Sequence, residues 1–389
     1  MTEKKPRILD KIYALEDIEA YAKKHLPKPI FGYVAGGAER NHTLRNNAED
    51  FANYKFIPNI LRNVSERSIK TEIFDREWDA PFGISPMGVS ALAAYRGDIV
   101  LAEAAKKMNI PMMISGSSLI PMEEIIKLAP GTWFQAYLPG EYDKVENLVL
   151  RVKKAGFETL VLTVDVAVLA GRENNLRNGF STPLRPSFRL LYQGLTHPNW
   201  SINTFLKTIF KHGMPHFENF LADRGEPVFS ASINRDFGKR SNLNWEHLRQ
   251  IRKLWDGNLI VKGILNKGDA LEAINLGADA IIISNHGGRQ LDSAISSIKA
   301  LENIRPHVKN DCKIFVDSGF RRGTDVIKAL ALGADFVFIG RPFLFAASIA
   351  GLPGVLHAIN LLKEEIDRDM ALLGVNEIGD LGHELLQKY

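Results

Sequence analysis

The sequence is poor in the features that mark several common classes of protein. Cys312 is the one cysteine among 389 residues, which excludes an internal disulfide and a cysteine-rich metal site. We therefore expect no metal centre, and a reducing compartment such as the cytoplasm suits this composition. The 49 Lys and Arg residues are almost balanced by 45 Asp and Glu, for a formal charge of only +4. This balance argues against the dense basic surface of a nucleic-acid-binding protein, so we expect no nucleic acid as a partner.

Long uninterrupted apolar runs are also missing. Residues 1–26 carry charges every few positions and have no apolar stretch followed by a small-residue cleavage site, so we expect no secretory signal. The most apolar stretch, residues 344–362, is interrupted by Gly351, Pro353 and His357. A membrane-spanning helix needs about 20 cleaner apolar residues. We predict instead a helix that covers the protein core, followed by a turn.

Eight short apolar runs recur along the chain, and stretches with helical spacing of apolar residues separate them. The eight runs are 81–87, 111–117, 133–137, 159–165, 259–263, 280–288, 313–319 and 336–342. Near-continuous apolar strands that alternate with helices are typical of a parallel sheet covered by helices. Eight repeats predict a closed α/β fold, the (β/α)8 TIM barrel, as a single domain over residues 1–389. An open doubly wound sheet is the alternative.

Two segments depart from the repeat. Residues 1–80 precede the first strand, and we expect an N-terminal helical segment that closes the bottom of the barrel or reaches round to its top. About ninety residues separate the fourth and fifth strands, and within them we assign an insertion at 177–240. We expect one side of a short helix in it to carry Phe205, Leu206, Ile209 and Phe210, with Lys207 and Lys211 beside them. That composition suits a helix lying in a membrane interface, and a lid or an oligomer contact is the alternative.

Polar residues gather where the predicted strands end. In a barrel these ends converge on one face, where the loops build active sites. His286 follows the sixth strand and precedes two glycines that permit close approach of a ligand. Its ordinary pKa of about 6.5 suits proton transfer at neutral pH, and Asp165 at the end of the fourth strand is the predicted orienting partner. The alternative is a hydrogen-bonded histidine of the core.

Two arginines form a second candidate group. Arg289 lies three residues after His286, and Arg172 lies seven residues after Asp165. Two guanidinium groups can hold a carboxylate through paired hydrogen bonds, which lysine would not reproduce. Surface salt bridges with Glu173 and Asp292 are the alternative.

The last two strands lead into glycine-bearing turns, at 317–325 and 338–342. In barrels such turns hold phosphate through backbone N–H groups and helix N-termini, and Arg321 and Arg341 add positive charge. Lys262 lies within the fifth strand, where a buried ammonium needs an anion nearby. The residues alone leave open whether it forms a Schiff base or stabilises negative charge on a flavin.

These motifs together resemble one family. The segments TVD (163–165), VKG (261–263), SNHGGRQLD (284–292), DSGFRRGTDVIKALALGA (317–334) and IGRP (339–342) stand in the order found in FMN-dependent α-hydroxy acid oxidases and dehydrogenases. The similarity extends over nearly the whole chain. It implies FMN as cofactor and oxidation of an (S)-2-hydroxy acid to the 2-keto acid.

The resemblance also implies roles for individual residues. His286 would accept the proton with Asp165 as its partner, and Arg172 and Arg289 would bind the substrate carboxylate. Tyr33 and Tyr137 would contact the substrate, and Lys262 would stabilise the reduced flavin, which argues against a Schiff base. The implied FMN contacts are Gly88, Ser115, Gln135, Thr163, Lys262, Ser284, Asp317, Gly319, Arg321, Gly340 and Arg341.

Two positions are similar to one branch of the family. Gly88 in Pro86-Met87-Gly88 stands where oxidases usually have alanine, and Ser117 replaces a tryptophan, which leaves space for a larger substrate. With the 177–240 insertion, these positions resemble the membrane-associated dehydrogenases of (S)-mandelate and L-lactate. This branch implies a quinone-type electron acceptor, peripheral contact with the inner face of the plasma membrane through 177–240, and a homo-oligomer, a tetramer. The alternatives are an oxidase that uses oxygen and produces hydrogen peroxide, and a flavin- or phosphate-binding barrel without turnover.

Overall fold

Eight parallel strands form the centre of the molecule. The computed structural model describes residues 6–309 and 312–389, except 182–183, 185–186 and 230–239. The strands are β4 (Phe82–Ile84), β5 (Met113–Ser115), β6 (Trp133–Tyr137), β7 (Thr159–Thr163), β8 (Asn258–Ile264), β9 (Ala280–Ile283), β10 (Lys313–Asp317) and β11 (Phe336–Ile339). They are hydrogen-bonded in the order β4-β11-β10-β9-β8-β7-β6-β5, and a parallel bridge between Ile84 and Met112 joins the two ends. The sheet is therefore a barrel, which confirms the predicted fold, and the open-sheet alternative is wrong.

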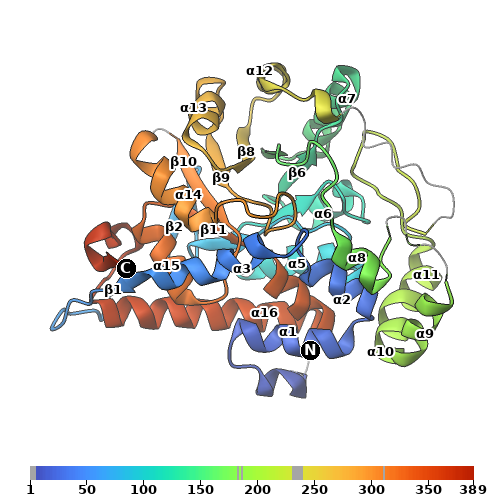
Figure 1. Ribbon diagram of the computed structural model, residues 1–389, viewed down its shortest axis with the longest axis horizontal. Helices are drawn as coiled ribbons and strands as arrows, with labels where there is room; N and C mark the ends of the chain where they lie inside the picture. The colour runs from blue at the N-terminus through green and yellow to red at the C-terminus, as the bar shows by residue number, and fades with distance from the viewer. Residues whose placement is uncertain (1–5, 182–183, 185–186, 230–239, 310–311) are drawn as a thin grey trace.

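Helices cover the outside of this barrel (Figure 1). They are α4 (Ser90–Ala93), α5 (Gly97–Lys107), α6 (Met122–Leu128), α7 (Tyr142–Ala155), α12 (Trp245–Leu254), α13 (Lys267–Asn275), α14 (Ser297–Ile304), α15 (Gly323–Ala331) and α16 (Arg341–Leu373). The last helix, α16, is kinked at Ala350 and Gly351, just before Pro353. By length and composition α16 could cross a membrane, but 61% of its apolar window is buried inside the protein. This burial is typical of a core helix, as the interrupted sequence predicted.

The barrel interior is a packed core of apolar side chains. It contains Met113, Trp133, Val161, Ile260, Ala280, Ile282, Phe315, Phe336 and Phe338. Inward-facing aromatic and β-branched residues from neighbouring strands fill the space, as in other barrels of this kind. A hairpin of β2 (Thr71–Ile73) and β3 (Arg76–Trp78) contributes Ile73 and Trp78 to the same cluster. The polar residues at the opposite ends of the strands are thus left to form a site above a solid floor.

The N-terminal segment both closes the bottom of the barrel and reaches round to its top. Its helices are α1 (Leu15–His25), α2 (Lys28–Ala35) and α3 (His42–Glu49), with short 3-10 turns η1 (Arg7–Lys11) and η2 (Asp50–Asn53). The hairpin β2–β3 closes the bottom of the barrel, while α2 and α3 reach the loops at its top. The segment is not entirely helical, because β1 (Tyr54–Phe56) pairs with the C-terminal strand β12 (Leu386–Lys388). The apolar pattern of so short a strand does not reveal this pairing.

The elements of the insertion are α8 (Glu173–Asn178), α9 (Phe188–Thr196), α10 (Pro198–Trp200), the π-helical turn η3 (Ser201–Leu206), α11 (Lys207–His212) and η4 (Arg240–Asn242). Helices α9, α10 and α11 form a corner of the molecule at the lower right of Figure 1, whereas α8 packs against α2. Parts of 177–240 lie outside the described residues. The prediction that Phe205 shares an outer face with Leu206 and Phe210 is wrong, because Phe205 is half-buried and stacks on Trp200. The wider π-helical turn changes the angle between successive side chains, which a regular helical pattern does not anticipate.

Candidate active site

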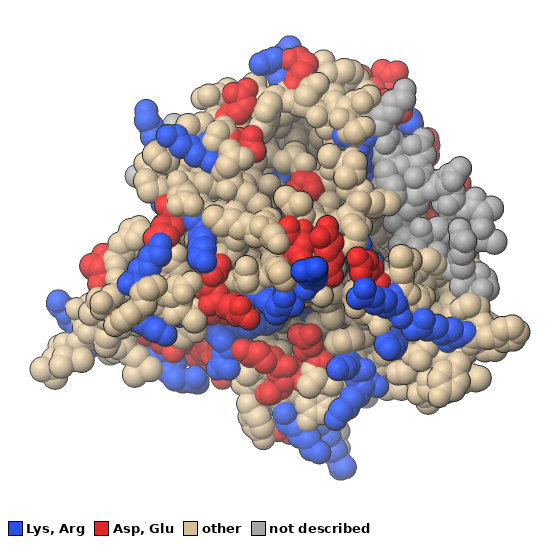
Figure 2. All heavy atoms as spheres, in the orientation of Figure 1, with Lys and Arg blue, Asp and Glu red and all other residues tan. Residues whose placement is uncertain are grey.

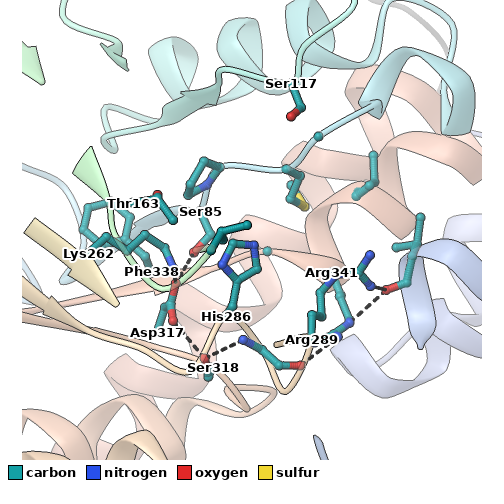
Figure 3. Close-up of a pocket in the computed structure, with 18 of the residues that line it drawn as sticks. Ser85, Ser117, Thr163, Lys262, His286, Arg289, Asp317, Ser318, Phe338 and Arg341 are labelled. Carbon is teal, nitrogen blue, oxygen red and sulfur yellow. Dashed lines mark hydrogen bonds and ion pairs between the residues drawn. The ribbon is translucent and has the colours of Figure 1, made fainter. Parts of the chain in front are cut away.

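One cavity opens at the C-terminal ends of the barrel strands and collects most of the predicted residues (Figure 3). The predicted residues that line it are Tyr33, Gly88, Tyr137, Thr163, Arg172, Lys262, His286, Arg289, Asp317, Gly319, Arg321, Gly340 and Arg341. The other four are Ser115, Gln135, Asp165 and Ser284, which are not among the lining residues. Asp165 and Ser284 each hydrogen-bond to a lining residue, and Ser115 bonds to Gln135.

His286 is held in one orientation by its carboxylate partner. Its Nδ1 lies 2.9 Å from Asp165 Oδ1, and its Nε2 faces the Tyr137 hydroxyl at 3.4 Å. The backbone of His286 is left-handed, with φ of 59°, and Gly287 continues this turn at 66°. A side chain on Gly263 would lie 2.7 Å from the Asp165 Cβ, so glycine in β8 makes room for the carboxylate. The predicted pairing of His286 with Asp165 is therefore present in the fold.

The charges around His286 favour its neutral form. Burial, together with the cations of Lys262 and Arg172, lowers the pKa of His286 more than Asp165 raises it. Burial by itself would raise the pKa of Asp165, but His286 and Lys262 hold it below its ordinary value. An ionised Asp165 accepts a hydrogen bond from Nδ1–H of His286, which keeps the proton on Nδ1 and leaves the lone pair of Nε2 directed into the cavity. This is the arrangement that a general base requires.

We expect the pH dependence of turnover to follow this imidazole. Protonated His286 cannot accept a proton, so kcat/KM should rise with pH, with a midpoint below the ordinary histidine value of 6.5. Replacing Asp165 by asparagine should move this midpoint to still lower pH, because the carboxylate raises the pKa of His286. Initial rates between pH 4.5 and 8 would measure both. A midpoint above 7 in the unaltered protein would contradict the assignment.

Lys262 is a buried cation with two partners. Its Nζ donates to Ser284 Oγ at 2.6 Å and lies 2.9 Å from Asp317 Oδ2. Although burial lowers the pKa of Lys262, Asp317 and Asp165 more than compensate, and the net shift is upward. A permanently protonated amine cannot attack a carbonyl group, so the geometry opposes Schiff-base chemistry. It suits an ammonium that stabilises negative charge at the floor of the cavity.

The two candidate carboxylate-binding arginines lie at the same mouth. Arg172 donates to Arg289 O at 2.9 Å and to Gln290 Oε1, and Arg289 donates to the carbonyls of Tyr33 and Gly36 at 2.7 and 2.8 Å. Burial and the charge of Arg172 lower the pKa of Arg289 to about 10, so it stays protonated at neutral pH.

The surface salt bridges that were considered for these arginines do not form. Glu173 pairs with Arg177, and Asp292 accepts the backbone N–H groups of Arg40 and Thr43. Two cations held together by backbone carbonyls form a ready site for an anion.

The residues around the cavity also fit a phosphate-bearing flavin. Arg321 and Arg341 are both half-buried, and desolvation lowers the pKa of each guanidinium. The charges of Arg289 and Arg321 lower the pKa of Arg341 further. Within the described part of the chain neither guanidinium has an ion-pair partner, and such half-buried charge calls for an anion.

A second observation comes from the strand ends of β6 and β7. Gln135 Nε2 and Thr163 Oγ1 are buried there without a hydrogen-bond partner among the described residues. The unpartnered polar atoms at these strand ends suit the polar edge of the flavin ring. The two arginines beside the helix N-termini suit the phosphate at the other end of FMN.

A buried pair of asparagines, which the sequence did not reveal, supports the loop that carries His286. Asn47 in α3 and Asn285 exchange two hydrogen bonds, of 2.8 and 2.7 Å, between their side-chain amides. Asn285 also accepts the backbone N–H of Gly288 and donates to the carbonyl of Ile295. Because the pair joins residues 238 positions apart, no local pattern could have indicated it.

We expect Asn47→Leu to disturb the catalytic loop. The change leaves the buried Asn285 amide without its partner, which typically costs about 1–3 kcal/mol. The free energy of unfolding should fall by that amount, and anaerobic oxidation of substrate should slow. Asn46→Leu, on the exposed side of the same helix, is the matched control. Unchanged stability and rate in Asn47→Leu would show that the pair does not position the loop.

The outer wall of the cavity was also not predicted. It includes Met87, Val166, Leu169, Phe220 and Arg240. The Arg240 guanidinium lies 4.6 Å from the ring centre of Phe220 and 5.0 Å from that of Tyr137. These side chains come from loops of differing length, so their meeting at one wall depends on the tertiary fold.

Comparisons with known proteins agree with this geometry. The family model described as FMN-dependent dehydrogenase matches residues 22–388. An L-lactate dehydrogenase of Ectopseudomonas mendocina (strain ymp) is 39% identical, with 97% of this chain and 99% of the relative covered. An (S)-mandelate dehydrogenase of Pseudomonas putida is 37% identical, with 97% and 94% covered. The crystal structure of a monotopic membrane protein, (S)-mandelate dehydrogenase, superposes with a TM-score of 0.87 at 36% identity, covering 97% of this chain and all of the other.

Proposed function

The chain belongs to the family of FMN-dependent dehydrogenases, and we propose how its own residues perform the reaction. It is an oxidoreductase that uses FMN to oxidise 2-hydroxy acids of the L-lactate or (S)-mandelate type to 2-keto acids. The observation that carries the assignment of roles is the convergence of the His286–Asp165 pair, two carboxylate-binding arginines and two phosphate-binding arginines on one cavity.

The substrate binds with its carboxylate between Arg172 and Arg289. Both guanidinium groups are held by hydrogen bonds to the protein, so little side-chain entropy is lost on binding. FMN, when bound, accepts the electron pair that leaves C2. His286 Nε2 accepts one of the two protons that the substrate loses, and Asp165 stabilises the imidazolium that results. The pKa of the Tyr137 hydroxyl is raised by burial, so it stays protonated and can donate a hydrogen bond to the substrate oxygen.

The test of this function is anaerobic reduction of the bound flavin. The purified protein should be yellow and should bleach when L-lactate, (S)-mandelate or another (S)-2-hydroxy acid is added. A panel of such acids would define the preferred substrate, and reoxidation by oxygen and by a quinone analogue would then be compared. A colourless protein, or a yellow one that no 2-hydroxy acid bleaches, would contradict the proposal.

We propose that a quinone reoxidises the flavin. Gly88 lines the cavity, and a Cβ there would lie 2.9 Å from the Ser117 Cβ and 3.6 Å from the Tyr33 hydroxyl. There is little space for a side chain at position 88, and the dehydrogenase branch that the sequence resembles also has glycine there. This similarity supports a quinone over oxygen as the acceptor. Faster reoxidation by oxygen than by a quinone analogue would favour the oxidase alternative.

The insertion carries the surface that we propose to contact the membrane. Phe188, Leu191 and Leu195 project from α9, with Phe188 93% exposed, and Phe210 of α11 is 83% exposed. The corner that these helices form has few charged side chains on the face shown in Figure 2. One relative is described as a monotopic membrane protein, which supports attachment to one side of a membrane, and we propose the inner face of the plasma membrane as that side. A helix with exposed aromatic and aliphatic side chains is suited to the interface.

Replacing Phe188, Leu191 and Leu195 together by serine should abolish this attachment. Each fully buried side chain of this kind contributes about 1.5–3 kcal/mol, so loss of all three should weaken binding to phospholipid vesicles by roughly a thousandfold or more. Flotation of the protein with vesicles measures the effect, and flavin reduction by substrate should not change. Leu61→Ser, at an equally exposed leucine elsewhere, is the control. Undiminished flotation of the triple variant would exclude α9 as the contact.

A further inference from the structure

A second cavity lies on the other side of helix α2 from the active site. It is a groove of about 520 Å³ between α1, α2, α3, α8 and the end of α9. Its polar lining comes from Lys23, Lys28, Asn41, Asn174, Asn178 and His197. Its apolar lining comes from Leu26, Phe31, Ala35 and Leu44. The groove is open to solvent on one side and combines apolar walls with groups that can donate hydrogen bonds.

Helix α2 is the wall that the two cavities share. Tyr33 and Val34 line the active site, whereas Gly32 and Ala35 line the groove. An α-helix with its side chains is only about 10–12 Å across. Helix α8 packs closely against α2 at Gly32, where a Cβ would lie 2.4 Å from Asn178 Nδ2. The Gly32 carbonyl accepts a hydrogen bond of 2.8 Å from Asn174 Nδ2 of α8. A molecule in the groove would therefore be separated from the reaction by one helix.

The groove also adjoins the exposed apolar corner. The backbone N–H of Lys28 donates to Gln193 Oε1 of α9 at 2.9 Å, which ties the start of α2 to that helix. His197, which follows α9, lines the groove, and Leu191 and Leu195 on α9 are exposed. A ligand with an apolar tail could keep the tail beside α9 while its polar ring occupies the groove.

From these contacts we propose that the groove binds the ring of a quinone, the electron acceptor on which the proposed function rests. Ammonium and amide groups supply donors for two carbonyl oxygens, and Phe31, Ala35 and Leu44 supply apolar surface for the ring. In the overall reaction the C–H and O–H bonds of the hydroxy acid break. The two electrons pass through FMN to the quinone, and its two oxygens each gain a proton, which gives the quinol. Substrate and acceptor then occupy different sites.

Charge reversal at the groove tests this proposal. Lys23→Glu with Lys28→Glu replaces two positively charged donors by carboxylates, so reoxidation of the reduced holoenzyme by a short-tailed ubiquinone analogue should slow at least tenfold. Ala35→Phe, which fills the groove, should have the same effect. Reduction by L-lactate or (S)-mandelate, and reoxidation by two equivalents of ferricyanide, should stay unchanged. Lys24→Glu, an exposed lysine of the same helix outside the groove, is the matched control.

A second measurement separates the groove from the active site. Oxalate can occupy the arginine clamp but has no hydrogen to transfer, and quinone reoxidation should persist when it saturates the enzyme. Loss of quinone reoxidation with oxalate, or groove variants that behave like the parent, would overturn the groove assignment. So would variants that lose only binding to anionic vesicles, because the groove would then hold a lipid headgroup. If the parent enzyme is reduced by substrate but not reoxidised by the quinone, the proposed acceptor is wrong as well.

Discussion

Replacing His286 by alanine is expected to slow flavin reduction by substrate by about 10²–10⁴-fold, the usual contribution of a positioned general base. The effect should be large because the Nε2 lone pair is the one basic group that Asp165 orients into the cavity. FMN should remain bound, since Arg321 and Arg341 are untouched. Stopped-flow absorbance under anaerobic conditions measures the rate. Rapid bleaching of this variant would remove His286 from the role of base.

The backbone at this position calls for a second variant. His286 has φ of 59°, a conformation that alanine adopts with strain and that asparagine tolerates. His286→Asn should therefore keep the loop in place and still lack the base, so both variants should be equally slow. His383→Ala, at an exposed histidine near the C-terminus, is the control for histidine loss in general. An asparagine variant that recovered activity would show that the alanine effect was structural.

Replacing Arg289 by lysine should weaken substrate binding far more than FMN binding. Lysine keeps the charge but loses the planar fork that makes two parallel hydrogen bonds with a carboxylate. One charge-assisted bond is worth about 1.5–3 kcal/mol, so kcat/KM should fall about 10- to 100-fold or more. The carbonyls of Tyr33 and Gly36 would also lose a donor, which would loosen α2 over the site. Steady-state kinetics and flavin titration measure the two effects separately.

Two other arginines serve as controls for this variant. Arg341→Lys should show the opposite selectivity, with weaker FMN retention and a smaller effect on substrate affinity, because Arg341 lies at the proposed phosphate end of the cavity. Arg177→Lys changes an exposed arginine that pairs with Glu173, and surface pairs contribute little. If Arg289→Lys binds substrate as tightly as the parent, the carboxylate clamp does not exist.

The strand ends were predictable from sequence because they combine two local patterns. Short β-branched runs bounded by glycine and polar residues, such as Ile281–Ile283, favour buried strands, and the polar residue that follows a buried strand of a barrel emerges at the loop face. That reasoning placed His286, Asp165 and Lys262 on the same side before any contact was known. It did not distinguish residues that line the cavity from those just behind it: Ser115, Gln135 and Ser284, which the family resemblance implies as FMN contacts, are not among the lining residues.

Features that depend on distant segments were out of reach. The Asn47–Asn285 pair, the Asp317 partner of Lys262 and the side-by-side position of the two cavities across α2 each join residues far apart in the sequence. Phe205 was expected on the same side of a regular helix as Leu206 and Phe210. The π-helical turn η3 has more residues per turn, which changes which side chains share a face, and Phe205 stacks on Trp200.

The sequence by itself determined which residue types stand at the ends of the strands, because hydrophobic periodicity and strand order are local properties of the chain. It also determined the charge balance and, through its one cysteine, that no internal disulfide can form. Only the tertiary structure decided which of these groups touch and which are buried. It also decided the direction in which the pKa of His286 moves, because the burial and the charges that folding brings around the imidazole lower that pKa from its ordinary value.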